Sequence, residues 1–185
     1  MEIFDVVDEK GNPTGETVER NTAHDKGIRH RTAHTWVARK NNGHTEFLLQ
    51  KRNDDKESFP GCYDTSSAGH IHAGDEPLVS ALRELEEELG IKADPSELKF
   101  AGTFTVDYEK EFFGRIFKDK EIPFVFVYTG NVDISELKLQ EEEVSGVKWF
   151  TEEEISDMIE KHDKICCVPK NGFLLAQKWC SSNLK

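Results

Sequence analysis

Residues 69–91 read GHIHAGDEPLVSALRELEEELGI and combine a glycine-containing turn with a strongly patterned helix. Leucines recur at spacings of 4, 3 and 4 residues, which places them on one helical face; they are Leu78, Leu82, Leu85 and Leu89. Asp75 is a natural N-cap, Pro77 fits the first turn, and Gly90 is a natural stop. The pattern predicts a helix over residues 77–89.

Three acidic residues of this helix share a second face. Glu84, Glu87 and Glu88 stand at i, i+3 and i+4, so their carboxylates project together, roughly opposite the leucines. Like charges at this spacing repel each other by a few tenths of a kcal/mol per pair. The acids form either a solvated helix face or a cluster of hard oxygen ligands for Mg²⁺ or Mn²⁺. Gly69 and Gly74, just before the helix, favour the metal site, because glycine lets backbone carbonyls approach a ligand.

The same stretch resembles the Nudix box, G-x5-E-x7-R-E-U-x-E-E-x-G-U, in which U is an aliphatic residue. The residues in register with the box are Gly69, Arg83, Glu84, Leu85, Glu87, Glu88, Gly90 and Ile91. One position departs from the box, because Asp75 stands where the family has its first glutamate. The resemblance implies an α/β/α sandwich and hydrolysis of a nucleoside diphosphate linked to another moiety.

The resemblance also implies roles for individual residues. Glu84, Glu87 and Glu88 would bind the divalent metals, the Gly69 carbonyl would complete a coordination shell, and Arg83 would orient the carboxylates by ion pairing. The reaction would be attack of a metal-activated water on one phosphorus of a diphosphate.

A further acid in this family often stands six residues before a tryptophan on a late strand. Glu143 holds that place relative to Trp149, so it is expected to act as an extra ligand or general base. The alternative is that Glu143 is simply one of three surface glutamates at residues 141–143.

A wider resemblance connects the chain with the Nudix branch of type I isopentenyl-diphosphate isomerase and its hydrolase relatives. The shared pattern consists of His30-Arg31 with Trp36, Phe59-Pro60-Gly61, and Ser67-Ala68-Gly69-His70. The isomerase binds a structural metal through three histidines and two acids, and the matching positions are His24, His30, His70, Asp119 and Glu121. Such a set would suit Zn²⁺ or Mn²⁺. The alternative is that the histidines are hydrogen-bonded structural residues.

Two departures from the isomerase favour hydrolysis. Ala68 occupies the place of the isomerase's catalytic cysteine, and alanine neither donates nor accepts a proton. Glu121 remains available as a catalytic group on the other face, but isomerisation needs an acid and a base on opposite faces of the alkene. The box carboxylates, which the isomerase typically loses, are intact. We therefore expect a hydrolase of a nucleoside diphosphate derivative or a prenyl diphosphate, with an isomerase or a non-catalytic ligand-binding module as the alternatives.

Aromatic residues later in the chain have two interpretations. They either line an apolar or base-stacking substrate pocket, or they pack in the core or within a loop. The residues concerned are Tyr108, Phe112, Phe113 and Phe117.

Composition limits the partners. The chain has 185 residues with 24 Lys+Arg and 36 Asp+Glu, giving a net charge of −12 that argues against a nucleic-acid partner. No apolar stretch approaches the length of a membrane span, and residues 1–10 do not resemble a signal peptide. The four cysteines are expected to be reduced thiols. We expect a cytoplasmic protein, monomeric or homodimeric, that binds a small-molecule diphosphate.

The pattern of elements predicts one α/β domain with a mixed sheet. A hairpin over residues 3–19 opens the chain, and strands are expected at 32–39, 46–51, 63–68, 99–108, 121–128 and 147–150, with further helices at 151–161 and 172–180. We divide the chain into an N-terminal β-hairpin extension (1–27), a Nudix domain (28–162) and a C-terminal helical segment of the same domain (163–185).

Overall fold

The computed structural model describes residues 2–184 and is built around one mixed β-sheet. The sheet order is β10-β4-β3-β9-β7, where β5 pairs with β4, β6 with β3, and β8 with β9. The strands are β3 (His30–Asn41), β4 (His44–Arg52), β5 (Tyr63–Asp64), β6 (Ser67–His70), β7 (Leu98–Thr103), β8 (Val106–Phe112), β9 (Arg115–Tyr128) and β10 (Val144–Thr151). Only the β3–β9 pairing is parallel; the other pairings of this sheet are antiparallel.

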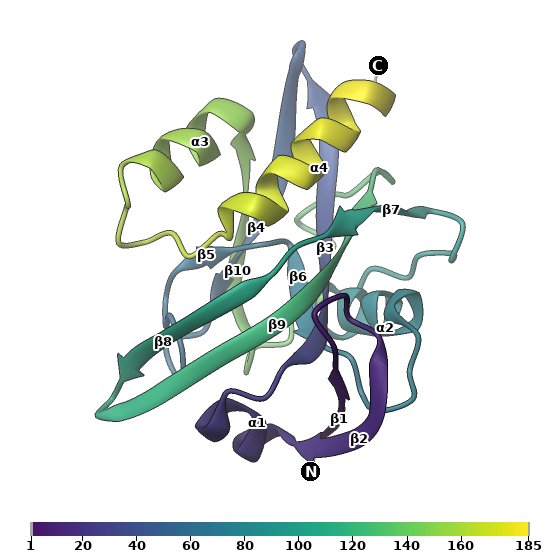
Figure 1. The fold of residues 1–185 in the computed structure, drawn as a ribbon. Coiled ribbons are helices and arrows are strands. Elements are labelled where there is room, and N and C mark those ends of the chain that lie inside the picture. Colours follow the sequence, from purple (N-terminus) through teal and green to yellow (C-terminus); the bar gives the residue numbers. More distant parts are fainter. Residues whose placement is uncertain (1, 185) are drawn as a thin grey trace.

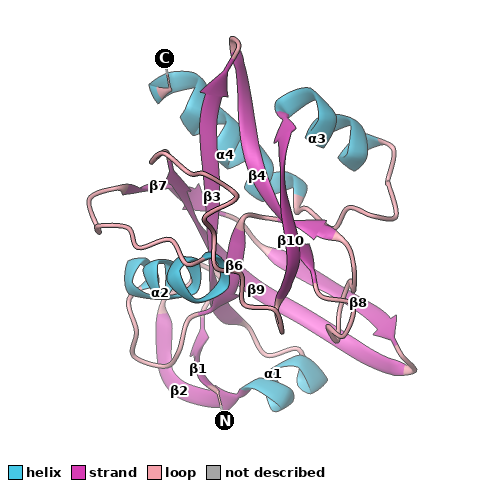
Figure 2. Cartoon of the chain, turned by 180° about the vertical axis from the view of Figure 1, so that it is seen from behind, coloured by secondary structure: helices cyan, strands magenta, loops and turns pink. Residues whose placement is uncertain are grey.

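Helices cover both faces of the sheet, which confirms the expected α/β/α sandwich. Helix α2 (Pro77–Leu89) packs on one face, and α3 (Glu152–Glu160) and α4 (Lys170–Asn183) on the other, as the opposite views show (Figures 1 and 2). Leu85 and Leu89 are buried in the first core layer, with Leu78 and Leu82 packed at its edge. Trp36, Phe47 and Phe173 are buried in the second layer. The leucine spacing thus predicted which face of α2 packs on the sheet.

The N-terminal segment forms the expected antiparallel hairpin of β1 (Ile3–Val7) and β2 (Pro13–Glu19). It docks beside the loop that leads into α2. Asp5 accepts hydrogen bonds from Arg31 Nη2 at 2.9 Å and from the Gly74 backbone N–H at 3.0 Å. The Ala73 N–H donates to the Ile3 carbonyl at 2.8 Å. These contacts fix the hairpin against the turn that carries the glycines.

Several sequence-based boundaries were wrong. Residues 20–26 form helix α1 (Arg20–Lys26), although the segment has no apolar stripe; its buried Ala23 and His24 pack inward. The single strand expected at 99–108 is divided between β7 and β8 at residues 104–105. Strand β9 begins at Arg115 rather than near residue 121, because its exposed first half pairs with β8 as a long hairpin.

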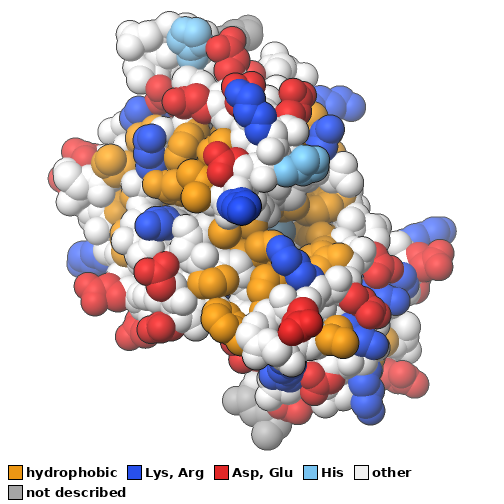
Figure 3. Space-filling view, turned by 90° about the vertical axis from the view of Figure 1, so that its left-hand side faces the viewer, with side chains coloured by type: hydrophobic (Ala, Val, Ile, Leu, Met, Phe, Trp, Pro, Cys, Tyr) orange, Lys and Arg blue, Asp and Glu red, His pale blue; other side chains and the backbone are white. Residues whose placement is uncertain are grey.

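The surface agrees with the acidic composition. On the face shown in Figure 3, basic and acidic side chains are interspersed with apolar ones, and no basic patch forms there. Within residues 2–184, no helix has the length and apolar character needed to cross a membrane.

Candidate active site

Helix α2 presents its acids at the edge of the sheet next to β6. It begins at Pro77 and ends at Gly90, whose φ of +72° and N–H bond to the Glu86 carbonyl (2.9 Å) form a left-handed C-cap. The expected N-cap was wrong: the cap residue is Glu76, and its side chain makes no capping hydrogen bond. Asp75 instead lies with its carboxylate 3.8 Å from His72 Nδ1, and its carbonyl accepts from Arg31.

Glu88 is the most enclosed of the three expected ligands, with 5% of the residue exposed. Its Oε2 accepts hydrogen bonds from Gln50 Nε2 at 3.2 Å and from the Ala68 N–H at 3.1 Å. Burial, followed by the nearby charge of Glu84, raises the pKa of Glu88 to about 8. Both of these donors are neutral, so neither hydrogen bond brings a positive charge to the ionised carboxylate.

Glu84 lies directly against Gly69. A Cβ atom at position 69 would overlap the Glu84 carboxylate, so only glycine leaves room for the acid beside this strand. Arg83 Nη1 contacts Glu84 Oε1 at 2.7 Å, and Arg83 Nη2 donates to the His70 carbonyl at 3.0 Å. Burial nevertheless raises the pKa of Glu84 to about 7, because it outweighs the lowering effect of Arg83.

Glu87 differs from its two neighbours. Its side chain is 53% exposed, and Arg83 Nη1 contacts its Oε2 at 3.1 Å. The three acids therefore differ in exposure and do not form the solvated helix face that was one of the two alternatives from their spacing. Arg83 contacts both Glu84 and Glu87, which is the arrangement that the family resemblance implied.

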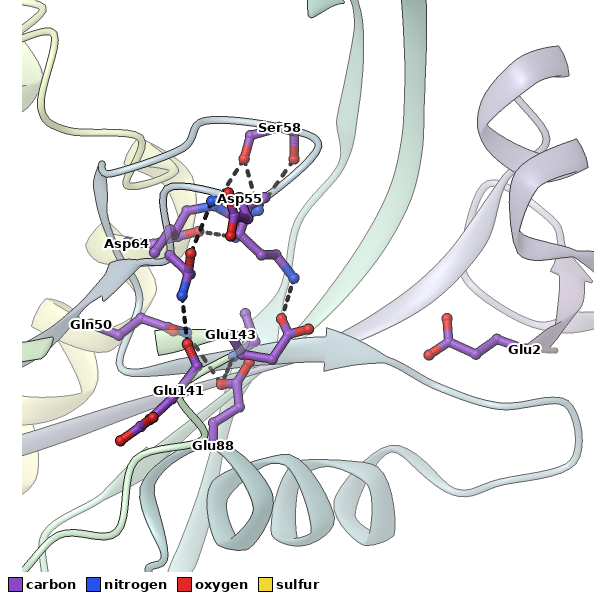
Figure 4. A network of polar contacts seen from close by, with 12 residues as sticks. Glu2, Gln50, Asp55, Ser58, Asp64, Glu88, Glu141 and Glu143 are labelled. Carbon is purple, nitrogen blue, oxygen red and sulfur yellow. Dashed lines mark hydrogen bonds and ion pairs between the residues drawn. The ribbon is translucent and has the colours of Figure 1, made fainter. Parts of the chain in front are cut away.

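Glu143 approaches the helix acids from the loop before β10. Its carboxylate forms a close ion pair with Lys56, and its charge contributes to the raised pKa of Glu88. The loop 53–61 that carries Lys56 is anchored by Arg52, which donates to the Ser58 carbonyl and pairs with Asp64 at 3.2 Å. Figure 4 shows Glu143 in the same region as Gln50 and Glu88, which are joined by the Gln50 Nε2–Glu88 hydrogen bond. Glu143 is thus a part of the carboxylate site by position.

The histidines named from the sequence converge on a second cluster. The ring centroids of His24, His30 and His70 lie 5.0 to 5.4 Å apart. Glu121 Oε1 lies 3.5 Å from His30 Nε2 and 3.6 Å from His70 Nε2, and Asp119 Oδ1 lies 3.7 Å from His24 Nδ1. The parallel register sets His30 directly opposite Glu121, which explains how residues far apart in the chain meet.

Several polar atoms of this cluster are buried without a hydrogen-bond partner among the described residues. They are His24 Nδ1, His30 Nε2 and Asp119 Oδ1. The opposite nitrogen of His30, Nδ1, lies 2.9 Å from the Ile28 carbonyl, and this contact orients the ring so that Nε2 faces Glu121. Unpartnered imidazole and carboxylate atoms this close together match the ligand set of a metal centre.

The residues of the cluster differ in their pKa shifts. Burial lowers the pKa of His24 to about 4 and that of His70 well below its ordinary value, so both rings are neutral at pH 7. Burial and the charge of Glu121 raise the pKa of Asp119 to about 9. Burial alone would raise the pKa of Glu121, but the neighbouring imidazoles, that of His30 first, bring it below the usual carboxyl range. Neutral imidazoles are the form that ligates metals.

Aromatic rings enclose the histidine cluster. Phe4 of β1 stacks on His30 and His70 with centroids 4.9 and 4.5 Å apart, and Phe117 stacks on His24 at 4.2 Å. The aromatic residues named from the sequence therefore do not share one role. Phe117 packs on the cluster, Phe112 packs against Phe59 at 4.9 Å, and Phe113 is 80% exposed at the hairpin turn.

Three residues of these sites escaped the sequence analysis. Gln50 donates to Glu88 and is a buried amide that directly follows the apolar residues 47–49. A polar side chain next to this apolar run was the available signal. Tyr108, considered as a pocket wall or a packing residue, instead hydrogen-bonds Asp119, and burial raises its pKa. Phe4 carried no signal, because its partners are fixed by the docking of the hairpin.

Comparison with known proteins agrees with this architecture. The NUDIX domain family model matches residues 29–167, and the chain belongs to the Nudix hydrolase family. Nudix hydrolase 3 of Arabidopsis thaliana is 38% identical over 165 residues, 88% of this chain, but the match spans only 21% of that protein. A Nudix hydrolase of Clostridium acetobutylicum, described as uncharacterized, is 34% identical over 96% of this chain and 82% of its own length.

The fold is similar to solved structures as well. A crystal structure from Deinococcus radiodurans superposes with a TM-score of 0.71 at 18% identity, covering 95% of this chain and 98% of the other. At this identity the likeness concerns the fold alone.

Proposed function

We propose that this Nudix hydrolase is a divalent-metal-dependent enzyme that cleaves the diphosphate linkage of a nucleoside diphosphate derivative or a prenyl diphosphate. The observation that carries the proposal is the pair of enclosed carboxylates, Glu84 and Glu88, beside the Gly69 backbone. Burial raises the pKa of both carboxyls, so a bound cation would favour their ionised form. A hard cation such as Mg²⁺ or Mn²⁺ supplies this positive charge.

The residues of the chain then have separate tasks. Glu84, Glu87, Glu88 and the Gly69 carbonyl would hold the cation, which when bound lowers the pKa of water and neutralises charge on phosphate oxygens. Arg83 keeps Glu84 and Glu87 in place through its two ion pairs. Glu143 acts as a further ligand or as the general base for the attacking water.

A second centre at the histidine cluster extends the proposal. His24, His30, His70, Asp119 and Glu121 would hold one transition metal, Zn²⁺ or Mn²⁺. The unpartnered buried atoms of these residues support it. The Thr32 hydroxyl donates to Glu121 Oε2 at 3.1 Å. Glu121 is also proposed as a catalytic group.

Hydrolysis is preferred over isomerisation because of position 68. Ala68 contributes its backbone N–H to Glu88, and its methyl side chain has no proton to exchange with a substrate carbon. A non-catalytic binding module is less consistent with the chain, because all three acids of the box are retained. We further propose a cytoplasmic enzyme, monomeric or homodimeric, with an N-terminal extension (1–27), a Nudix domain (28–162) and a C-terminal helical segment (163–185).

The experiment is phosphate release from a panel of diphosphates, with Mg²⁺, with Mn²⁺ and with chelator. We expect release from at least one substrate, loss of activity with chelator, and a drop in kcat of orders of magnitude in Glu88→Gln. Glu86→Gln is the matched control, since Glu86 lies on the same helix, half-exposed, 3.1 Å from Lys92. Full activity in Glu88→Gln, or equal losses in both variants, would remove Glu88 from the site.

A further inference from the structure

A short seam joins the end of the loop 53–61 to the segment before α4. The Tyr63 N–H donates to the Ile165 carbonyl at 2.7 Å, and the Cys167 N–H donates to the Tyr63 carbonyl at 2.9 Å. Tyr63 and Cys166 form a parallel bridge and pack together against the core layer of α3 and α4. Because side chains alternate along extended backbone, Cys62 and Cys167 lie on the opposite side of the seam.

The two thiols occupy this side together. Cys62 Sγ donates to the Lys164 carbonyl at 3.3 Å, and Cys167 Sγ donates to the Tyr63 carbonyl at 3.4 Å. Cys62 is half-buried and follows Gly61 at the end of the loop. A cavity of about 520 Å³ lies next to the seam, with Cys166 and Cys167 in its wall. Cys62 does not line this cavity, but its own partial exposure gives a small oxidant access to the thiol.

The environment separates the two cysteines chemically. The neighbouring Cys167 side chain lowers the pKa of Cys62 to about 7, whereas the contact with Cys62 and burial raise the pKa of Cys167 well above its ordinary value. Burial raises the pKa of Cys180 to about 12. The thiolate is the reactive form of cysteine, so Cys62 is the nucleophile of the four and Cys167 the adjacent resolving thiol.

We propose that Cys62 and Cys167 form a redox modification site, which a peroxide oxidant converts to an intramolecular disulfide. The Cys62 thiolate attacks a peroxide oxygen, the O–O bond breaks, and Cys62 becomes a sulfenic acid while hydroxide leaves. The Cys167 sulfur then attacks the Cys62 sulfur, the S–O bond breaks, and the thiol proton leaves with the oxygen as water. Overall, two thiols and one hydrogen peroxide give one disulfide and two waters.

The disulfide would add a covalent link between two parts of the chain that are joined by hydrogen bonds and packing. Cys62 is tied to β4, because its carbonyl accepts from the Arg52 N–H at 2.9 Å, and Arg52 in turn holds Ser58 of the loop. Oxidation would thus clamp the loop that carries Lys56 to the seam. Neither cysteine belongs to the proposed metal ligands.

The test treats the intact protein with hydrogen peroxide at neutral pH and maps cysteine peptides by mass spectrometry without reduction. We expect loss of two hydrogen masses, a cross-linked pair of peptides containing Cys62 and Cys167, and reversal by dithiothreitol. Cys62→Ser and Cys167→Ser should each abolish the cross-link, while Cys180→Ser should keep it. Circular dichroism spectra of all variants verify that each one is folded.

Specific results would overturn the proposal. A cross-link of Cys62 to Cys166, or one between the adjacent Cys166 and Cys167, would show that Cys167 is not the partner of Cys62. Conversion of Cys62 to a sulfinic acid with Cys167 still reduced would show that no resolving thiol acts on it. Equal alkylation rates of Cys62 and Cys180 by iodoacetamide would contradict the selective reactivity of Cys62.

Discussion

Replacing Glu88 with glutamine is expected to stabilise the metal-free protein at alkaline pH. Glu88 is enclosed beside Glu84, and its pKa is raised from 4.5 to about 8, chiefly by burial. At about 1.36 kcal/mol per pKa unit, ionisation of this carboxyl costs at most about 5 kcal/mol of folding free energy. Relaxation of the surroundings reduces such values, so we expect a difference on the order of 3 kcal/mol.

The sign follows from proton binding in the two states. The folded protein holds the Glu88 proton up to about pH 8, whereas the unfolded chain releases it near pH 4.5. The folded state binds more protons in this window, so stability falls as pH rises from 4.5 to 8 and the full loss is present above pH 8. Glutamine carries no charge at any of these values, so the variant lacks this loss.

The assay is urea unfolding of wild type and Glu88→Gln with chelator at pH 5 and pH 9, followed by circular dichroism. The difference in unfolding free energy between the two proteins should be larger at pH 9 by the stated amount. Glu86→Gln should show no such change, and saturating Mg²⁺ should remove the advantage of the glutamine. A difference that is the same at both pH values would refute an ionisation of Glu88 that is suppressed by burial.

Three further predictions concern neighbouring features. Gly69→Ala places a methyl group where the Glu84 carboxylate lies, so Mg²⁺ affinity measured by calorimetry should fall at least tenfold, while Gly146→Ala, which meets no atom within 4 Å, should leave it unchanged. Phe4→Ala removes the ring stacked on two histidines, so it should lower the free energy of unfolding in urea by about 3–5 kcal/mol. The content of bound transition metal, measured by elemental analysis, should fall as well. The control Ile3→Ala changes an exposed residue and should alter stability by less than about 0.5 kcal/mol. Wild-type protein given isopentenyl diphosphate in D₂O should leave no deuterium on a methyl carbon by proton NMR, and Ala68→Cys should introduce a trace; robust incorporation by wild type would favour the isomerase.

Periodic signals in the sequence predicted the parts of the fold that depend on local patterns. Pro77 and Gly90 gave both ends of α2, and the helix expected at 151–161 corresponds to α3, which begins with a capping box of Thr151 and Glu154. Helix α1 was missed because its seven residues have no apolar stripe and are held by tertiary contacts of Ala23 and His24. Propensity and pattern do not contain such contacts.

The candidate site divides in the same way. Motif spacing brought Glu84 and Glu88 together, because a helix converts spacing directly into position. It did not predict that Glu88 is buried while Glu87 is exposed, since that difference depends on how α2 is turned against β6. Gln50 comes from β4, and only the packing of the strand against the helix makes it a partner of Glu88.

The register of His30 opposite Glu121 has a consequence for how the molecule assembles. The histidine cluster and the central parallel pairing of the sheet form in one event, which joins segments some ninety positions apart. Contacts of such long sequence separation form slowly, because the intervening chain must be closed into a loop first. During synthesis His24 and His30 leave the ribosome well before their acidic partners. Uptake of the proposed transition metal by the nascent chain should therefore lag behind formation of the β3–β4 hairpin and coincide with completion of β9.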